Sequence, residues 1–180
     1  MYEKVCEHLK NGGIVAYPTD TLYGLGVNPF DRKALLRLFE LKDMEPRVIS
    51  VAFPDFLEAS KYAVLPDELA EIFPAPVTVI AEALSNWDCI TFEGKIGIRI
   101  PDNTTALALL NECGPMTATS ANVHGGPNLD LEGIKETFGE NVMVVEGEEP
   151  KYMKPSTIVD IVDKKVIREG AFSPGRLFQD

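Results

Sequence analysis

The stretch that decides the fold is Tyr17-Pro-Thr-Asp-Thr-Leu-Tyr-Gly-Leu-Gly26, near the start of a chain of 180 residues. The β-prone run Ile14-Val-Ala-Tyr17 leads into it, and a helical pattern begins after it, near Asp31. Many α/β proteins place their ligands where a strand opens into a polar, glycine-containing loop. Proline and glycine alone predict no more than a turn. The role of this loop therefore depends on what the rest of the chain supplies.

Strands and helices are predicted to alternate along the whole chain. Helical patterns cover 2–10, 31–42, 54–62, 102–114 and 131–138, and a short helix follows Pro66. β-prone runs cover 14–17, 48–53, 77–81, 96–100, 116–119, 142–146, 157–161 and 165–168. Asp31 is the predicted N-cap of the second helix, which places Lys42 in the last turn of that helix. The alternation favours an α/β layered sheet in one domain over residues 1–180.

Composition limits the classes of function. The chain has 28 acidic and 17 basic residues and a formal net charge of -11, a balance that repels polyanions at long range. Broad coating of nucleic acid is therefore disfavoured, whereas a local basic pocket for a nucleotide needs only a few converging cations. No apolar run approaches the roughly 18 residues of a membrane span, and the charged first residues do not resemble a signal peptide. We expect a cytoplasmic protein.

The cysteines are Cys6, Cys89 and Cys113. Their odd number, wide spacing and lack of a Cys-x-x-Cys pair predict reduced thiols, with neither a disulfide framework nor a zinc site.

Polar features follow the ends of several predicted strands. They are the loop at 19–23, Arg99 after Gly97, the run at 119–122, and the run at 155–157 with Arg168 on a neighbouring strand. These hydroxyls, amides and guanidinium groups suit an anionic small molecule such as a nucleotide or an amino acid. The chain contains neither a Walker-type phosphate loop nor a Gly-x-Gly-x-x-Gly turn, and its two histidines do not predict a hydrolase triad.

Taken in order, these features resemble the YrdC-like family, whose members are threonylcarbamoyl-AMP synthases. The matching strings are Tyr17-Pro-Thr-Asp-Thr-Leu-Tyr-Gly-Leu-Gly26, Phe39-Glu-Leu-Lys42, Pro74-Ala-Pro-Val-Thr78, Gly97-Ile-Arg-Ile-Pro101, Thr119-Ser-Ala-Asn122 and Pro155-Ser-Thr-Ile-Val-Asp160, followed by Ile167-Arg-Glu-Gly170. They extend over nearly the whole chain, whose length resembles the short, single-domain members of the YrdC and YciO type. The resemblance implies an open, twisted, mixed β-sheet with helices packed on it and a deep polar cavity.

The resemblance also implies a reaction. L-threonine, bicarbonate and ATP give threonylcarbamoyl-AMP and pyrophosphate, with Mg²⁺ carried by the nucleotide and no metal site on the protein. The product passes to a threonylcarbamoyl transferase that modifies tRNA. An amine must attack bicarbonate or its activated form, and a carbamate oxygen must then attack the α-phosphorus. The protein therefore has to position reactants and stabilise charge, and it needs no nucleophile of its own.

Site residues are assigned by the same resemblance. The residues predicted to bind L-threonine are Thr21, Arg99, Ala118 and Ser156, with Arg99 on the carboxylate. The residues predicted to carry catalysis are Lys42, Arg99, Ser120 and Asn122. The residues predicted to bind ATP are Lys42, Arg47, Lys95, Ser120, Asn122, Asn128 and Arg168.

The segment after Lys42 departs from the family pattern. Family members carry Lys-x-Arg there, whereas Met44 stands at the arginine position of this chain, and Ala52 or Phe53 stands where many members have a histidine. Losing a guanidinium that pairs with phosphate weakens nucleotide binding unless another cation replaces it, and Arg47 and Lys95 are the predicted replacements. The alternative is a member that has lost synthesis and works as a nucleotide- or double-stranded-RNA-binding module, with weak binding of tRNA.

Overall fold

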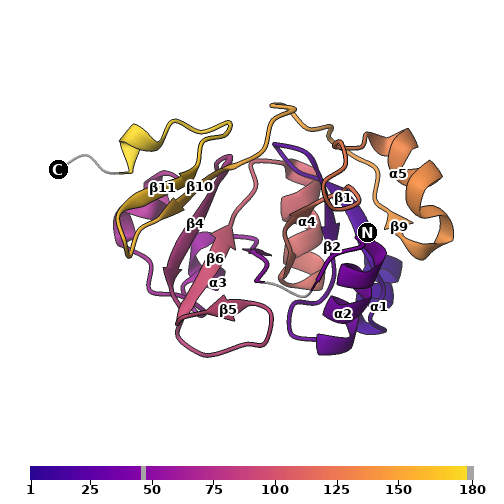
Figure 1. Ribbon diagram of the computed structural model, residues 1–180, viewed down its shortest axis with the longest axis horizontal. Helices are drawn as coiled ribbons and strands as arrows, with labels where there is room; N and C mark the ends of the chain where they lie inside the picture. The colour runs from indigo at the N-terminus through magenta and orange to yellow at the C-terminus, as the bar shows by residue number, and fades with distance from the viewer. Residues whose placement is uncertain (46–47, 178–180) are drawn as a thin grey trace.

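Short strands and amphipathic helices alternate along residues 1–45 and 48–177, which are the residues that the computed structural model describes (Figure 1). The α-helices are α1 (Glu3–Lys10), α2 (Arg32–Leu41), α3 (Phe56–Ala59), α4 (Thr104–Cys113) and α5 (Leu131–Phe138), and 3-10 turns span Asp67–Glu71, Gly139–Asn141 and Pro174–Arg176. The strands are β1 (Val15–Pro18), β2 (Tyr23–Gly26), β3 (Val51–Ala52), β4 (Val77–Glu82), β5 (Thr91–Phe92), β6 (Lys95–Arg99), β7 (Met116–Thr117), β8 (Thr119–Ser120), β9 (Met143–Val144), β10 (Thr157–Asp160) and β11 (Lys165–Arg168). Among the described residues, no helix is long and apolar enough to cross a membrane.

The strands form two mixed sheets. The four-stranded sheet has the order β8-β2-β1-β9, and the seven-stranded sheet runs β11-β10-β4-β6-β3-β7 with β5 paired to β6. In Figure 1 the first sheet lies toward α1 and α2, and strands β4, β6, β10 and β11 lie on the other side of α4. Strand β7 ends at Thr117 and β8 begins at Thr119, so the chain crosses from one sheet to the other at Ala118. We call this boundary between the two sheets the seam.

The mixed, twisted α/β architecture predicted from the sequence is confirmed, with one difference in the first loop. Tyr23–Gly26 forms strand β2, which pairs antiparallel with β1 in the register Val15 to Gly26. The polar turn is therefore short, and Gly26 belongs to a strand instead of a loop. A Cβ atom at Gly26 would lie 2.9 Å from Cε1 of the fully buried Tyr17. A glycine inside a strand often marks such a close approach.

Several element boundaries differ from the predicted ones. The strand predicted at 48–53 is reduced to Val51–Ala52, whereas the helix at 131–138 has the predicted bounds. Asp31 caps α2 as predicted, since its carboxylate accepts hydrogen bonds from the backbone nitrogens of Lys33 (2.9 Å) and Ala34 (3.2 Å). Lys42 follows α2 as its C-cap and is not in the last turn.

Two hydrophobic clusters support the sheets. The larger cluster joins the inner face of α2, including Leu35, Leu38 and Phe39, to the central strands. The smaller cluster lies where α1, α4 and β1 meet, and it contains Leu109 of α4 and Tyr17 of β1. The smaller cluster therefore supports the start of the polar turn from behind.

A disulfide bond joins Cys6 of α1 to Cys113 at the end of α4. The prediction of reduced thiols is therefore wrong for this pair, and Cys89 is the free cysteine. The two partners are 107 residues apart, and α1 and α4 become neighbours only when the chain folds. Glu112 of α4 also contacts the start of the chain, because its carboxylate accepts hydrogen bonds from the amino group of Met1 (3.1 Å) and the backbone nitrogen of Tyr2 (2.7 Å).

Reduction of the Cys6–Cys113 bond is expected to destabilise the protein. Closing so long a loop contributes about 2–5 kcal/mol, which corresponds to a fall in melting temperature of roughly 5–15 °C for a chain of this size. Calorimetry with and without reductant, together with the Cys113→Ser variant, measures the effect. Cys89→Ser is the control and should keep the sensitivity to reductant. An identical melting temperature under both conditions, or titration of all cysteines as free thiols, would contradict the bond.

Candidate active site

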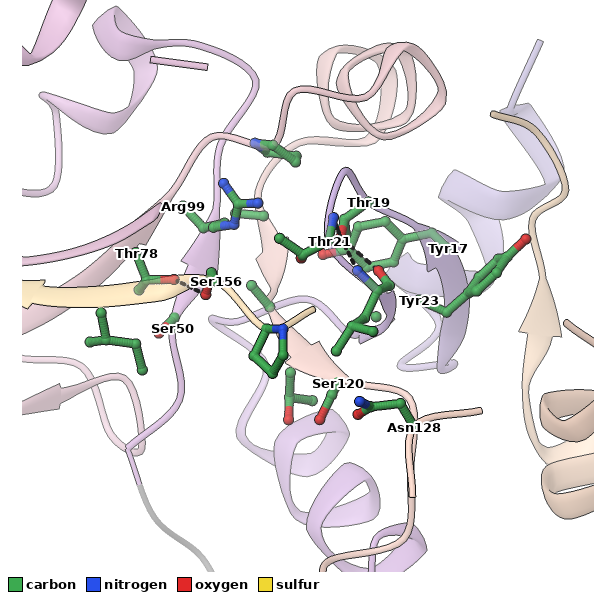
Figure 2. Close-up of a pocket in the computed structure, with 18 of the residues that line it drawn as sticks. Tyr17, Thr19, Thr21, Tyr23, Ser50, Thr78, Arg99, Ser120, Asn128 and Ser156 are labelled. Atoms are coloured by element: carbon green, nitrogen blue, oxygen red, sulfur yellow. Dashed lines mark hydrogen bonds between the residues drawn. The ribbon is translucent and has the colours of Figure 1, made fainter. Parts of the chain in front are cut away.

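A cavity of about 330 Å³ opens at the seam, with walls from both sheets (Figure 2). The wall on the side of the four-stranded sheet includes Tyr17, Thr19, Thr21, Leu22, Tyr23, Gly24, Thr119 and Ser120. The wall on the side of the seven-stranded sheet includes Ala52, Thr78, Arg99, Ser156, Ile158 and Arg168. Figure 2 shows Thr78, Arg99 and Ser156 facing Thr19 and Thr21 across the cavity. Residues from distant parts of the chain thus meet at one hollow.

The charged side chains that line the cavity are cationic, although the protein as a whole is acidic. Arg99 and Arg168 are its charged lining residues among those that the structure describes, and no described carboxylate lines it. Burial lowers the pKa of both guanidinium groups, but arginine stays charged at neutral pH. The net charge of the whole chain is -11. An anionic group is therefore attracted to this cavity and repelled by much of the remaining surface.

The turn between β1 and β2 presents two hydroxyl groups. The Thr19 hydroxyl donates to the carbonyl oxygen of Leu22 (2.6 Å) and lies 3.0 Å from the Thr21 hydroxyl. Because the single hydrogen of Thr19 is used on Leu22, Thr21 is the donor between the two hydroxyls. The lone pairs of the Thr21 oxygen then remain for a donor in the cavity, such as an ammonium or a hydroxyl group.

Arg99 is held from several directions although it lines the cavity. Its Nη1 donates to the carbonyl oxygens of Ala75, Val77 (3.3 Å) and Ile100 (3.2 Å), and its Nη2 forms an ion pair with Asp20. Its Nε has no hydrogen-bond acceptor among the described residues. Arg99 thus presents a fixed guanidinium with donor capacity left for a ligand carboxylate.

Ser156 and Arg168 form the polar part of the opposite wall. The Ser156 hydroxyl lies 3.0 Å from the hydroxyl of Thr78. Arg168 donates from Nη2 to the carbonyl oxygen of Ser156 (2.8 Å) and to its hydroxyl (3.3 Å). Since those contacts use one side of the guanidinium, Arg168 retains N–H groups for an anion.

Lys42, Ser120 and Asn122 come together at the foot of the cavity. Lys42 is 3% exposed, and its Nζ donates to the carbonyl oxygens of Ser120 (2.6 Å) and Asn122 (2.6 Å). The Asn122 side-chain oxygen accepts from Lys42 (3.0 Å) and from the Ser120 hydroxyl (2.8 Å). Ser120 lines the cavity, whereas Lys42 and Asn122 lie behind it.

The predicted replacement cation Lys95 lies elsewhere. Its Nζ is 2.9 Å from carboxylates of both Asp160 and Asp163. Lys95 and Arg99 stand at opposite ends of β6, about 13 Å apart at the rise of a β-strand. Lys95 does not line the cavity, and its predicted role in binding phosphate stays a prediction.

The other departures from the family pattern concern Arg47 and Met44. Arg47 lies outside the described residues, so its predicted role stays a prediction. Met44 packs against the larger hydrophobic cluster, where a thioether is accommodated and a guanidinium would need a partner. The residue that replaces the family arginine therefore serves the core.

A second compartment of about 290 Å³ adjoins the cavity. It is lined by Leu22, Tyr23, Asn128, Leu129, Asp130, Pro150 and Met153. It shares Leu22, Tyr23 and Asn128 with the main cavity, so the two spaces are neighbours. Its lining is mainly apolar, in contrast to the hydroxyl-rich main cavity. No group of three or more His, Cys, Asp or Glu side chains among the described residues is arranged to hold a metal ion.

Comparison with known proteins agrees with this geometry. The sequence profile of the Sua5/YciO/YrdC family, described as "Telomere recombination", matches residues 7–170. The chain belongs to this family. A relative from Methanocaldococcus jannaschii is 37% identical over 93% of this chain and 86% of its own length. The threonylcarbamoyl-AMP synthase of Vibrio campbellii is 31% identical over 94% of this chain and 98% of its own length.

A solved structure shares the fold of this family member. P. abyssi Sua5 complexed with L-threonine superimposes with a TM-score of 0.85 at 26% identity, over 97% of this chain. This chain spans 55% of that Sua5 chain, so the match concerns slightly more than half of the larger protein.

The predicted site residues sort into groups by position. Those that line the cavity are Thr21, Arg99, Ala118, Ser120, Asn128, Ser156 and Arg168. Sequence reasoning missed Asp20 and Thr78, which pair with Arg99 and Ser156 respectively. The position of Asp20 between two threonines was a local signal for a site residue, but it could not identify the partner, Arg99, which is 79 residues away. The roles of all these residues stay predictions.

The packing of Tyr17 against β2 leads to a test. Gly26→Ala would place a methyl group 2.9 Å from Cε1 of Tyr17, a buried ring whose hydroxyl is held by its hydrogen bond to the carbonyl oxygen of Thr117 (3.0 Å). We expect a loss of about 1–3 kcal/mol in the free energy of unfolding, because added volume in a packed site causes strain. Urea denaturation measures it. Gly175→Ala, where nothing lies within 4 Å of the new Cβ, is the control. Equal stability of the two variants would contradict the described packing.

Proposed function

We propose that the protein is an L-threonylcarbamoyl-AMP synthase. It joins L-threonine, bicarbonate and ATP to give threonylcarbamoyl-AMP, pyrophosphate and water. The observation that carries this proposal is the cavity at the seam, which holds two arginines and many hydroxyls and no described carboxylate, in a protein with a net charge of -11. The name of the Vibrio campbellii relative and the L-threonine bound by P. abyssi Sua5 support the same activity.

In this proposal the threonine-binding part of the cavity is formed by Thr21, Arg99 and Ser156, with Ala118 beside them. The carboxylate of L-threonine pairs with Arg99, whose guanidinium is fixed before the ligand arrives. The Thr21 oxygen accepts a hydrogen bond from the amino or hydroxyl group of the substrate. Preorganised partners of this kind reduce the entropy that binding must cost.

Mg²⁺–ATP is the second substrate and meets Ser120, Asn128 and Arg168. Because Met44 supplies no cation and packs against the larger hydrophobic cluster, Arg168 is the lining guanidinium that remains for a phosphate group. Lys42 and Asn122 support Ser120 from behind through the hydrogen bonds described above. Mg²⁺ neutralises charge on the leaving pyrophosphate.

The chemistry consists of two bond-forming steps. The ammonium group of threonine loses a proton to the solvent, and the amine attacks the carbon of bicarbonate; a C–N bond forms, and loss of water gives a carbamate. A carbamate oxygen then attacks the α-phosphorus of ATP, and the bond to pyrophosphate breaks. The cavity aligns three reactants and stabilises negative charge with Arg99 and Arg168, which are the contributions that such a reaction requires.

The product is an activated adenylate whose threonylcarbamoyl group is transferred to the adenosine of a tRNA by a separate transferase, with release of AMP. A cytoplasmic location stays a prediction. The alternative function, binding of double-stranded RNA, requires cations on a broad outer face, whereas Arg99 and Arg168 line a cavity that is too small for a duplex.

Release of pyrophosphate tests the proposal. Purified protein should release it from ATP only when L-threonine and bicarbonate are both present, and without added tRNA. Reactions that omit each substrate in turn are the controls. No release at saturating substrates from folded protein, or release that does not depend on threonine, would overturn the function.

Arg168→Gln tests the nucleotide-binding part of the cavity. Losing a charge-assisted contact to phosphate is expected to raise the KM for ATP by about 10- to 100-fold, with a smaller change in the KM for threonine. Lys165→Gln is the matched control, because Lys165 lies on the same strand and pairs with Asp163 outside the cavity. If both variants keep the KM of the wild type for ATP, Arg168 does not bind the nucleotide.

A further inference from the structure

Asp20 has a position that its motif does not explain. It stands between Thr19 and Thr21, whose side chains line the cavity, but Asp20 itself does not line it. The residue is 0% exposed. One carboxylate oxygen forms the ion pair with Arg99, and the other has no hydrogen-bond partner among the described residues. A buried charge of this kind is costly unless it is paired, so the Asp20 carboxylate depends on Arg99 for its stability.

The Asp20–Arg99 pair joins the two sheets at the cavity. Asp20 belongs to the turn of the four-stranded sheet, and Arg99 ends β6 in the centre of the seven-stranded sheet. The chain itself crosses between the sheets at Ala118, on the seam. The ion pair is therefore a charged connection between the walls, beside the hydrogen bond from the Tyr17 hydroxyl to the carbonyl oxygen of Thr117 (3.0 Å), and its two side chains are 79 positions apart in sequence.

The backbone of Asp20 is fixed as well. Its carbonyl oxygen accepts hydrogen bonds from the backbone nitrogens of Lys151 and Tyr152, both at 3.0 Å. The Lys151 side chain in turn lies 3.5 Å from the carboxylate of Asp102, just beyond β6. The Asp20 carboxylate thus extends from a hydrogen-bonded backbone, and it orients Nη2 of Arg99 while the three backbone carbonyl oxygens described above orient Nη1.

We propose that Asp20 is a positioning residue for L-threonine, which acts through Arg99 without touching the substrate. The ion pair keeps the guanidinium at the cavity wall and keeps the two walls at a separation that one amino acid can bridge. This inference rests on the proposed function. It assigns to Asp20 the control of threonine affinity and leaves ATP affinity to the other end of the cavity.

Asp20→Asn removes the charge with little change of shape. Arg99 then loses its counter-ion inside the wall, and nothing charged holds the turn to β6. The KM for L-threonine is expected to rise about tenfold or more, while the KM for ATP stays within about twofold and kcat at saturating threonine falls by less. Calorimetric titration with L-threonine and with ATP gives the same comparison without turnover.

Asp160→Asn is the matched control. Asp160 is also buried and also pairs with a cation of β6, since its carboxylate lies 2.9 Å from Lys95 at the other end of that strand. It does not line the cavity. A purely structural effect of removing a buried aspartate would appear in both variants, whereas the proposal predicts a changed threonine KM for Asp20→Asn alone.

The pH profile gives a readout on the wild-type protein. Burial raises the pKa of the Asp20 carboxyl, and the charge of Arg99 opposes that rise. The other titratable groups that face it are Tyr17 of β1 and Asp102. A carboxyl with a raised pKa becomes neutral on acidification before exposed aspartates do, and the ion pair is then lost. On acidification the threonine KM should begin to rise at a pH above the ordinary titration range of an aspartate, and this rise should be absent in Asp20→Asn.

The outcomes separate the inference from the function on which it rests. If the wild-type protein neither binds nor uses L-threonine, the proposed function fails and the inference fails with it. If the wild type binds L-threonine and Asp20→Asn binds it equally well or better, the inference alone is overturned. Should Asp20→Asn not fold, the wild-type pH profile decides, and a threonine KM that stays flat until the pH reaches the ordinary titration range of an aspartate overturns the inference.

Discussion

A buried guanidinium inside a cavity wall is the constraint on which this site depends. Arg99 is 4% exposed, so its charge has to be balanced by the protein before any ligand binds. Asp20 and the carbonyl oxygens around Arg99 provide that balance. Their positions require β1, β6 and the turn at Thr19–Leu22 to meet at the seam. The short hairpin, with Gly26 against Tyr17, follows from the same requirement.

The charged residues that line the site are cationic, whereas the protein as a whole carries a net negative charge. Carboxylates dominate the chain, whereas Arg99, Arg168 and neutral hydroxyls line the cavity. An anionic substrate therefore gains electrostatic energy only inside the cavity, which favours small anions over polynucleotides. Met44 stands where the family pattern has an arginine, and the proposed function assigns the binding of phosphate to Arg168. The lining suits a reaction that is catalysed by alignment and charge stabilisation.

Local signals in the sequence were sufficient for much of the fold. The Asp31 cap, the helix at 131–138 and the order of the motifs each depend on neighbouring residues or on family resemblance, and the structure agrees with them. Features that depend on contacts between distant residues were missed, because no local sequence pattern indicates which distant residue is the partner. The Cys6–Cys113 bond and the Asp20 partner are examples. The ion pairs of Lys95 are a further example, since the carboxylates of Asp160 and Asp163 come from β10 and the turn after it.

The central claim is that this cavity makes threonylcarbamoyl-AMP, and identification of the product tests it most directly. The protein is incubated with L-threonine, ATP and ¹³C-labelled bicarbonate. The nucleotides are then separated, and their masses are measured by mass spectrometry. The account predicts an adenylate with the mass of threonylcarbamoyl-AMP that carries the ¹³C label and disappears when threonine is omitted. AMP or ADP without a labelled threonylcarbamoyl adduct, from folded protein at saturating substrates, would contradict it.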